Sequence, residues 1–224
     1  MGLNMTKKLG RLILVGVVGS LSGCSAYMST GIDEGMVPPT PLPIQEMAVM
    51  PVTTEPGSEG LRPGMALALM EVMDARFPWL ALMGPEEAGA RLDQAGGAQD
   101  YADLLEDFDR TGVADSQRLA AVTRALGSDH FLQVRASYRE EEFLDPLLFS
   151  YDEFDDETRQ TLVLVARLWT HQGPGPVWEA VVRTTSETDD FREEEHTVDE
   201  IIFEVVGRLA DRMPVAPPGQ GPEG

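Results

Sequence analysis

The chain has few residues of the types that perform catalysis or bind metals. Its three histidines, His130, His171 and His196, have neither the His-x-x-His nor the His-Glu-x-x-His spacing of zinc sites. No Gly-x-Ser-x-Gly nucleophile elbow is present. The "QGPGP" segment at 172–176 places prolines where backbone N–H groups would have to bind phosphate. We therefore predict no catalytic residue, no metal site and no cofactor, and we expect that the protein is not an enzyme.

The single cysteine, Cys24, is the exception, because its position suggests a specific modification. The first eleven residues include Lys7, Lys8 and Arg11. An apolar run at 12–21 follows, and then two small residues before the cysteine. A basic start, a short apolar segment and small residues before a cleavage point are typical of a secretory signal peptide. The run is too short to cross a bilayer, which requires about 20 apolar residues.

The segment Leu21-Ser22-Gly23-Cys24 resembles the lipobox of bacterial lipoproteins. The resemblance implies that Cys24 receives a diacylglycerol thioether, that residues 1–23 are removed, and that the new amino terminus is acylated, for example with palmitate. In Gram-negative lipoproteins an aspartate after the cysteine retains the protein in the inner membrane, so Ser25 implies an outer-membrane protein that faces the periplasm. The alternative is an ordinary signal peptide in which the cysteine occurs by chance.

The charge of the chain disfavours several kinds of partner. Three of the 17 basic residues lie in the first 23 positions, which leaves 14 arginines against 38 acidic residues and a charge of −24. Nucleic acid is a disfavoured partner, because phosphate contacts require a basic surface. Electrostatic docking on anionic lipid is disfavoured for the same reason. The predicted membrane attachment is therefore the acylated Cys24.

Composition divides the chain into four segments: a signal peptide at 1–23, a lipidated and Pro-rich flexible tether at 24–45, one domain at 46–213 and a disordered tail at 214–224. Periodicity within the domain predicts an α/β (α+β) fold with a mixed sheet of about five strands and helices packed on it, in the order β-α-β-α-α-α-β-β-β-α. The expected strands lie at 46–52, 79–83, 130–138, 161–169 and 177–184.

Two helices carry the clearest end signals. Asp115 is a predicted N-cap and Gly127 a predicted C-terminal stop. Thr197 and Glu200 have the spacing of a capping box, and the helix that follows has an apolar stripe at Ile201, Val205 and Leu209.

The domain resembles a group of periplasmic α/β domains on three segments: "MAVMPV" (47–52), "LAAVTRALGSDHFLQV" (119–134) and "VARLWTHQGPGPVWEA" (165–180). The group includes the amino-terminal domain of the Tol-Pal β-propeller protein, the penicillin-binding-protein activator lipoproteins and the curli-secretion lipoprotein family. Within the third segment, Gly173 and Trp178 match the glycine and tryptophan of that group's last hairpin. The resemblance implies an interaction module in envelope assembly, without catalytic residues.

Two acidic stretches, 139–159 and 186–200, are expected to be solvated loops, and the alternative is weak association with calcium at this charge density. The first is unusual because it contains seven large apolar side chains: Phe143, Leu144, Leu147, Leu148, Phe149, Tyr151 and Phe154. These residues either fold back as a lid on their own domain or present an apolar surface to a partner. Trp169 and Trp178 either pack the last hairpin against a helix or stack on a ligand.

These observations favour a lipid-anchored, periplasm-facing adaptor in cell-envelope assembly or maintenance, which binds an envelope protein and performs no catalysis. The alternative is a structural or secretion-channel lipoprotein subunit that forms a homo-oligomer.

Overall fold

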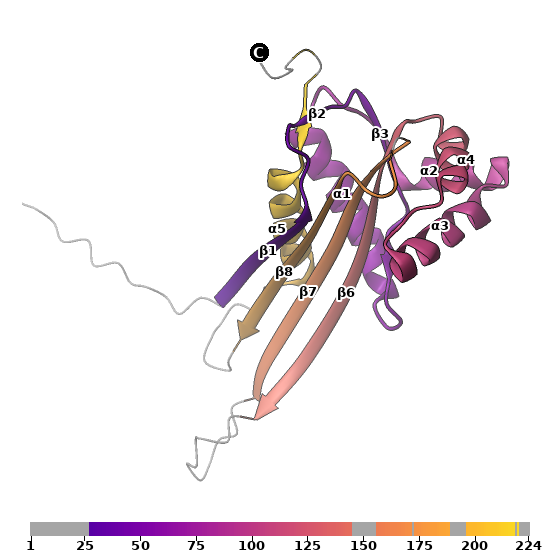
Figure 1. Cartoon of the computed structure of the whole chain (residues 1–224). Coiled ribbons are helices and arrows are strands. Elements are labelled where there is room, and N and C mark those ends of the chain that lie inside the picture. The colour runs from indigo at the N-terminus through magenta and orange to yellow at the C-terminus, as the bar shows by residue number, and fades with distance from the viewer. Residues whose placement is uncertain (1–26, 145–155, 172, 189–195, 218, 220–224) are drawn as a thin grey trace, which may run out of the picture.

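The computed structural model describes residues 27–144, 156–171, 173–188, 196–217 and 219. It shows an α+β fold in which helices pack on a mixed sheet, which confirms the predicted fold class (Figure 1). Within the described ranges the sheet has seven strands, two more than expected. The ten predicted elements follow in the predicted order, and the structure adds a ten-residue strand and three two-residue strands.

The strands are β1 (Tyr27–Met36), β2 (Leu42–Pro43), β3 (Glu46–Val49), β4 (Thr53–Thr54), β5 (Ala81–Met83), β6 (His130–Leu144), β7 (Asp156–Thr170), β8 (Trp178–Thr188) and β9 (Val215–Ala216). The helices are a 3₁₀ turn η1 (Glu59–Leu61), α1 (Arg62–Arg76), α2 (Pro85–Ala95), α3 (Ala98–Thr111), α4 (Ser116–Leu126) and α5 (Val198–Arg212).

The main sheet has the strand order β1-β8-β7-β6-β3-β5, and β4 also pairs with β6. β1, β8, β7 and β6 are antiparallel to one another along this order. β3 and β4 run parallel to β6, and β5 runs parallel to β3. β2 and β9 form a separate parallel pair. β1 is therefore one edge of the main sheet, and the three-residue β5 is the other.

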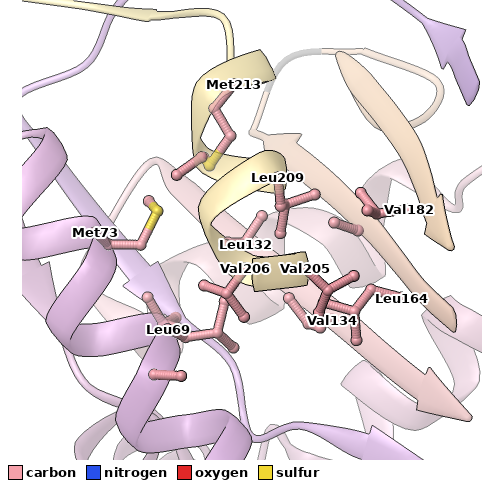
Figure 2. Packing of buried hydrophobic residues seen from close by; sticks show 14 of the residues in the cluster. Leu69, Met73, Leu132, Val134, Leu164, Val182, Val205, Val206, Leu209 and Met213 are labelled. Carbon is pink, nitrogen blue, oxygen red and sulfur yellow. The ribbon is translucent and has the colours of Figure 1, made fainter. Parts of the chain in front are cut away.

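The larger core lies between the sheet and the helix pair α1 and α5 (Figure 2). Val205 of α5 lies close to Val134 of β6 and Leu164 of β7, and all three side chains are fully buried. Alternate residues of each antiparallel strand point to this side, as expected for a sheet with one apolar face. The predicted stripe of α5 is confirmed, since Ile201, Val205 and Leu209 have no exposed surface.

The smaller core lies on the opposite face, where α2, α3 and α4 cover the sheet near β3 and the start of β6. Phe131 and Trp169 stack at a centroid distance of 5.7 Å, and Phe108 of α3 contacts Trp169 edge-on at 5.0 Å. These helices cover only this end of the face, so the remainder of β6, β7, β8 and β1 has no helix above it in the described part of the chain.

Both predicted N-caps are present. The Asp115 carboxylate accepts hydrogen bonds from the backbone N–H groups of Gln117 and Arg118. Thr197 and Glu200 form a reciprocal capping box. Gly127 ends α4 with a φ of 66°, a left-handed conformation that favours glycine.

Two segments that the sequence assigned to the tether and the tail contain strands. β1 lies within the predicted flexible tether and pairs with β8 from Tyr27 to Met36. Its formation depends on that pairing and on the partial burial of Met28 and Ile32 against the larger core, because its own sequence has low strand propensity. Val215 and Ala216, in the predicted disordered tail, pair with β2.

The expectation of a solvated loop at 139–159 is wrong at both ends. β6 continues to Leu144 and β7 begins at Asp156, so these charged segments form a long antiparallel hairpin. Likewise, Ser186, Glu187 and Thr188 belong to β8. In the described ranges, no helix has the length and hydrophobicity that are needed to cross a bilayer.

Candidate functional site

Most of the site residues predicted from the sequence cannot be placed. Cys24 lies outside the described residues, as do five of the seven apolar residues of the acidic stretch: Leu147, Leu148, Phe149, Tyr151 and Phe154. Phe143 and Leu144 are paired backbone positions at the end of β6, opposite Glu157 and Asp156. The choice between a lid and a docking surface is therefore untested, and both hypotheses remain predictions.

The burial of Trp169 and Trp178 shows that they pack within the protein and do not stack on a ligand. Trp169 and Trp178 have no exposed surface, and they belong to the smaller and the larger core respectively. The Trp169 indole N–H donates a hydrogen bond of 3.2 Å to the Gln133 side-chain oxygen. Both residues pack the hairpin against helices, and neither presents a ring on which a ligand could stack.

The histidines do not converge on a metal site. No cluster of three or more histidine, cysteine or carboxylate side chains with metal-binding geometry occurs among the described residues. His130 begins β6, and His171, just after β7, lies 3.5 Å from the Asp129 carboxylate. Burial lowers the pKa of His130, and the neighbouring His171 acts in the same direction, against Asp129 and Glu46.

The candidate site lies on the uncovered part of the sheet, which we call the open sheet face. It consists of the side chains of β1, β8, β7 and β6 that point away from α1 and α5. A concave region of about 690 Å³ lies on it. The lining residues are Ser29, Glu55, Ser137, Tyr138, Arg139, Glu141, Arg159, Thr161, Val163, Arg183, Thr185 and Glu187. This volume is within the range of small-ligand sites, although the lining is more polar than is usual for them.

Strand register explains why these residues meet. Arg139 pairs with Thr161, which pairs with Thr185, which pairs with Ser29, so one row of the face crosses four strands. Paired residues in a sheet point to the same side, and every second residue along each strand joins them. The row provides three hydroxyl groups and a guanidinium group.

Most charges on the open sheet face are paired. Arg159 Nε lies 2.7 Å from the Glu187 carboxylate, and Arg139 lies 3.6 Å from Glu141. Such exposed pairs contribute little to stability, but they neutralise the two arginines locally.

A charged network marks the boundary between the open sheet face and α3. The Asp109 carboxylate accepts hydrogen bonds from Arg135 at 2.7 Å and from Arg167 at 2.6 Å. Arg167 also donates to Glu179 at 2.6 Å and lies 4.9 Å from the Phe108 ring centroid. Burial alone would raise the pKa of Asp109, but the hydrogen bonds and charges of the two arginines outweigh it and hold that pKa below its usual value.

The two arginines thus fasten α3 to the sheet. Arg167 is only 14% exposed, so its guanidinium group depends on the two carboxylates for most of its polar contacts. The pKa of Arg167 is raised, because the hydrogen bonds to Glu179 and Asp109 outweigh the effect of burial. This network fixes where the helical cover ends and the open sheet face begins.

The start of β1 and the end of the β6–β7 hairpin lie at one end of the sheet. Tyr27 at the start of β1 pairs with Glu187 near the end of β8, which pairs with Arg159, which pairs with Glu141. The β6–β7 hairpin continues three residues beyond this row, to Leu144 and Asp156. The start of β1 and the end of this hairpin therefore lie at the same end of the molecule (Figure 1).

The open sheet face was not predicted from the sequence. Residues 135–141, "RASYREE", alternate between side chains of the larger core and side chains of the open face, but the charged end of this segment was assigned to a loop. The alternation could have extended the strand by several residues. It could not have identified the partners, because Ser29 and Glu55 are far from this segment in the sequence.

No family model matches the chain, and no curated protein matches it. Several solved structures are similar at low sequence identity. One is a PelC dodecamer from Paraburkholderia phytofirmans, with 10% identity, a TM-score of 0.38, and coverage of 84% of this chain and 99% of that chain. A lipoprotein from Neisseria meningitidis has 16% identity, a TM-score of 0.36, and coverage of 74% and 98%.

A hypothetical protein from Chlamydia trachomatis has 13% identity, a TM-score of 0.41, and coverage of 76% of this chain and 91% of that chain. None of these similarities reaches a TM-score of 0.5, so we base no functional argument on them. The resemblance to the Tol-Pal, penicillin-binding-protein activator and curli-secretion domains remains a prediction. The comparisons therefore do not assign the chain to a family.

Proposed function

We propose that the protein is a lipid-anchored adaptor of the bacterial envelope, which faces the periplasm and binds a partner on its open sheet face without performing catalysis. The observation that carries this proposal is the position of Cys24, three residues before β1. The predicted acylation site is thus followed almost directly by a strand of the main sheet, so the anchor would also orient the domain.

The short stretch of chain between Cys24 and β1 limits how far the start of β1 can lie from the membrane. Three residues span at most about 11 Å, even when they are fully extended. An acylated Cys24 would therefore hold the start of β1, and Glu187 beside it, within about 11 Å of the membrane surface. The β6–β7 hairpin projects from the same end, whereas Asp129 and the start of β6 lie at the opposite end. Asp129 would be about 40 Å farther along the strands, at roughly 3.3 Å per residue.

In this orientation the open sheet face lies along the side of the domain rather than against the membrane. Its polar rows are accessible to another envelope component, while α1 and α5 cover the opposite face. The mature charge of −24 favours association with a basic partner surface. Outer-membrane placement rests on Ser25 and on a Gram-negative source.

The anchor is tested by Cys24→Ala. We expect this variant to lack acylation and to accumulate as an uncleaved precursor or a soluble protein, which mass spectrometry and membrane fractionation would detect. Ser22→Ala is a matched control that keeps a small residue before the cysteine, and it should be processed normally. Full processing and membrane retention of the Cys24→Ala variant would disprove the lipid anchor.

The orientation is tested with fluorophores on the lipidated protein in bilayer nanodiscs. Cys24 is the only cysteine, so a cysteine introduced at Glu187 or Asp129 gives a unique label once Cys24 is acylated. A quencher on the lipid headgroups should reduce the emission from position 187 strongly and that from position 129 weakly. Equal quenching at both positions would contradict the proposed orientation.

The binding surface is tested by photo-crosslinking in native membranes. A crosslinking amino acid at Thr185, on the open sheet face, should capture a defined envelope protein. The same amino acid at Glu71, an exposed position of α1 on the opposite side of the molecule, is the control and should not capture it. Capture at position 71 but not at position 185 would move the binding surface to the helices.

The homo-oligomeric alternative is favoured by one observation: β1 is an edge strand of ten residues whose outer side pairs with no described strand. Such an edge is able to pair with another chain. Size-exclusion chromatography with light scattering on the detergent-solubilised lipoprotein separates the two functions. An adaptor should elute as a monomer or dimer, and a channel subunit as a larger closed assembly.

A further inference from the structure

One row of the open sheet face places two opposite, unpaired charges on either side of the concave region. Ser137, Val163, Arg183 and Gly31 are cross-strand partners in sequence across β6, β7, β8 and β1. Glu55 extends the row on the other side, because Thr54 pairs with Ala136 and the Glu55 N–H donates to the Ala136 carbonyl at 3.3 Å. Glu55 and Arg183 both line the concave region.

These two charges differ from the other charged side chains of the concave region. Arg159 pairs with Glu187 and Arg139 pairs with Glu141, as described above. Neither Glu55 nor Arg183 has an ion pair or a side-chain hydrogen bond in the described part of the chain, and both are exposed. Among the described residues, the region therefore has one carboxylate without a partner at one side and one guanidinium group without a partner at the other.

Arg183 also differs from the other arginines that have no partner. Among the described residues these are Arg124 and Arg212, and each lies in the last turn of a helix, where the helix dipole favours a cation. Arg183 lies within a strand, where no dipole explains it. Its direct cross-strand neighbours are Val163 and Gly31, neither of which has a polar side chain.

The surroundings of Arg183 leave room for a ligand. A side chain at Gly31 would meet no atom within 4 Å, so packing within the protein does not require a glycine there. Glycine inside a strand often marks a place where a ligand approaches the backbone. Glu55 and Arg183 are separated by three strand spacings, or about 14 Å between backbones, and both side chains are long enough to shorten that gap.

We propose that this row binds a short peptide-like zwitterion, with its carboxylate on Arg183 and its ammonium group on Glu55. A tripeptide with free ends is about 10 Å long, which matches the span between the two side chains. The Ser137 hydroxyl and the half-buried Val163 form the floor beneath it. The inference rests on the proposed use of the open sheet face for binding, but it does not depend on the lipid anchor.

The test is a titration of the mature protein, in the form in which it is isolated, with trialanine, N-acetyl-trialanine and trialanine amide, and with the protein-free solution as the blank. Trialanine should bind, and blocking either end should weaken binding at least about fivefold. In Arg183→Gln, trialanine and its amide should bind equally weakly. In Glu55→Gln, trialanine and its acetylated form should bind equally weakly.

Arg124→Gln removes an equally unpaired arginine from α4 and should bind like the parent protein. All three variants change exposed side chains, so their thermal unfolding should match that of the parent. The inference is overturned if trialanine does not bind, or if the blocked peptides bind as well as trialanine. If the peptide result is negative but the crosslink from position 185 still forms, only the zwitterion site is refuted and the adaptor function is retained. If peptide binding and the crosslink are both absent, both proposals are refuted.

Discussion

At the scale of single residues, Asp109 connects two layers of the molecule, because a carboxylate on α3 accepts hydrogen bonds from arginines on β6 and β7. Replacing Asp109 with Asn would leave the largely buried Arg167 with Glu179 as its remaining carboxylate. We expect Asp109→Asn to lower the free energy of unfolding by about 1–2 kcal/mol at pH 7, allowing for the partial exposure of the site. Urea denaturation of both proteins measures this difference.

The difference should depend on pH. Because the folded-state pKa of Asp109 is held below its unfolded value of about 3.9, the carboxylate contributes its full stabilisation above that pH and loses it as the pH falls through the lower, folded-state pKa. The unfolding curves of parent and variant should therefore converge as the pH falls below about 4. A difference that remained constant over this range would show that Asp109 is not the titrating group.

His130 should produce a second pH dependence, closer to neutrality. Burial lowers its folded-state pKa, so protons bind more readily to the unfolded chain. The stability that the neutral ring contributes is complete above about pH 6.5 and is lost as the pH falls through the lower folded-state pKa. We expect the melting temperature of the parent to fall more than that of His130→Gln between pH 7.5 and pH 5.

At the scale of elements, α5 is the most informative test of the packing. Val205 is fully buried against Val134 and Leu164 of the sheet, so Val205→Asp would place an unpaired charge in the larger core. The cost should be on the order of 3–5 kcal/mol, enough to unfold a domain of ordinary stability at a moderate temperature.

The matched control lies two residues earlier in the same helix. Phe203 is 39% exposed, so Phe203→Asp also replaces an apolar side chain with a carboxylate but keeps it in water. We expect this control to melt within a few degrees of the parent. Similar melting temperatures for Val205→Asp and the parent, measured by circular dichroism, would refute the packing of α5.

Elements with local signals could be predicted from the sequence. The Asp115 cap, the Gly127 stop and the capping box at Thr197 each depend on residues within one or two helical turns, and all three are present. β1 could not be predicted in this way. Its two glycines and two acidic residues disfavour a strand, and it forms because β8, distant in the sequence, provides the hydrogen-bonding partner.

The ends of β6 and β7 were missed for a related reason. A run of charged residues indicates solvent exposure, which a loop and the uncovered side of an antiparallel sheet share. In the structure, the register places Arg159 between Glu141 and Glu187, so opposite charges lie side by side on the exposed face of the paired strands. No local pattern predicts the row that joins Glu55 to Arg183, because it exists only once β4, β6, β7 and β8 have paired.

At the scale of the whole molecule, the predicted anchor and the sheet together constrain how two copies can associate. β1 begins three residues after Cys24 and runs away from the end of the sheet that holds it. Two copies that paired their β1 edges about a two-fold axis would have antiparallel strands, as isologous edge pairing requires. Their two acylated cysteines would then lie at opposite ends of one continuous sheet.

Such a dimer could not insert both anchors into the same leaflet, so symmetric β1 pairing is excluded for copies that share one membrane surface. The same geometry would tether two bilayers that face each other, with the shared sheet as the spacer. Vesicles carrying the lipidated protein should therefore remain dispersed if β1 stays unpaired, and should cluster if two edges meet. Dynamic light scattering of such vesicles, compared with vesicles carrying an Ile32→Pro variant whose edge strand is interrupted, would distinguish a protein that acts within one membrane from one that bridges two.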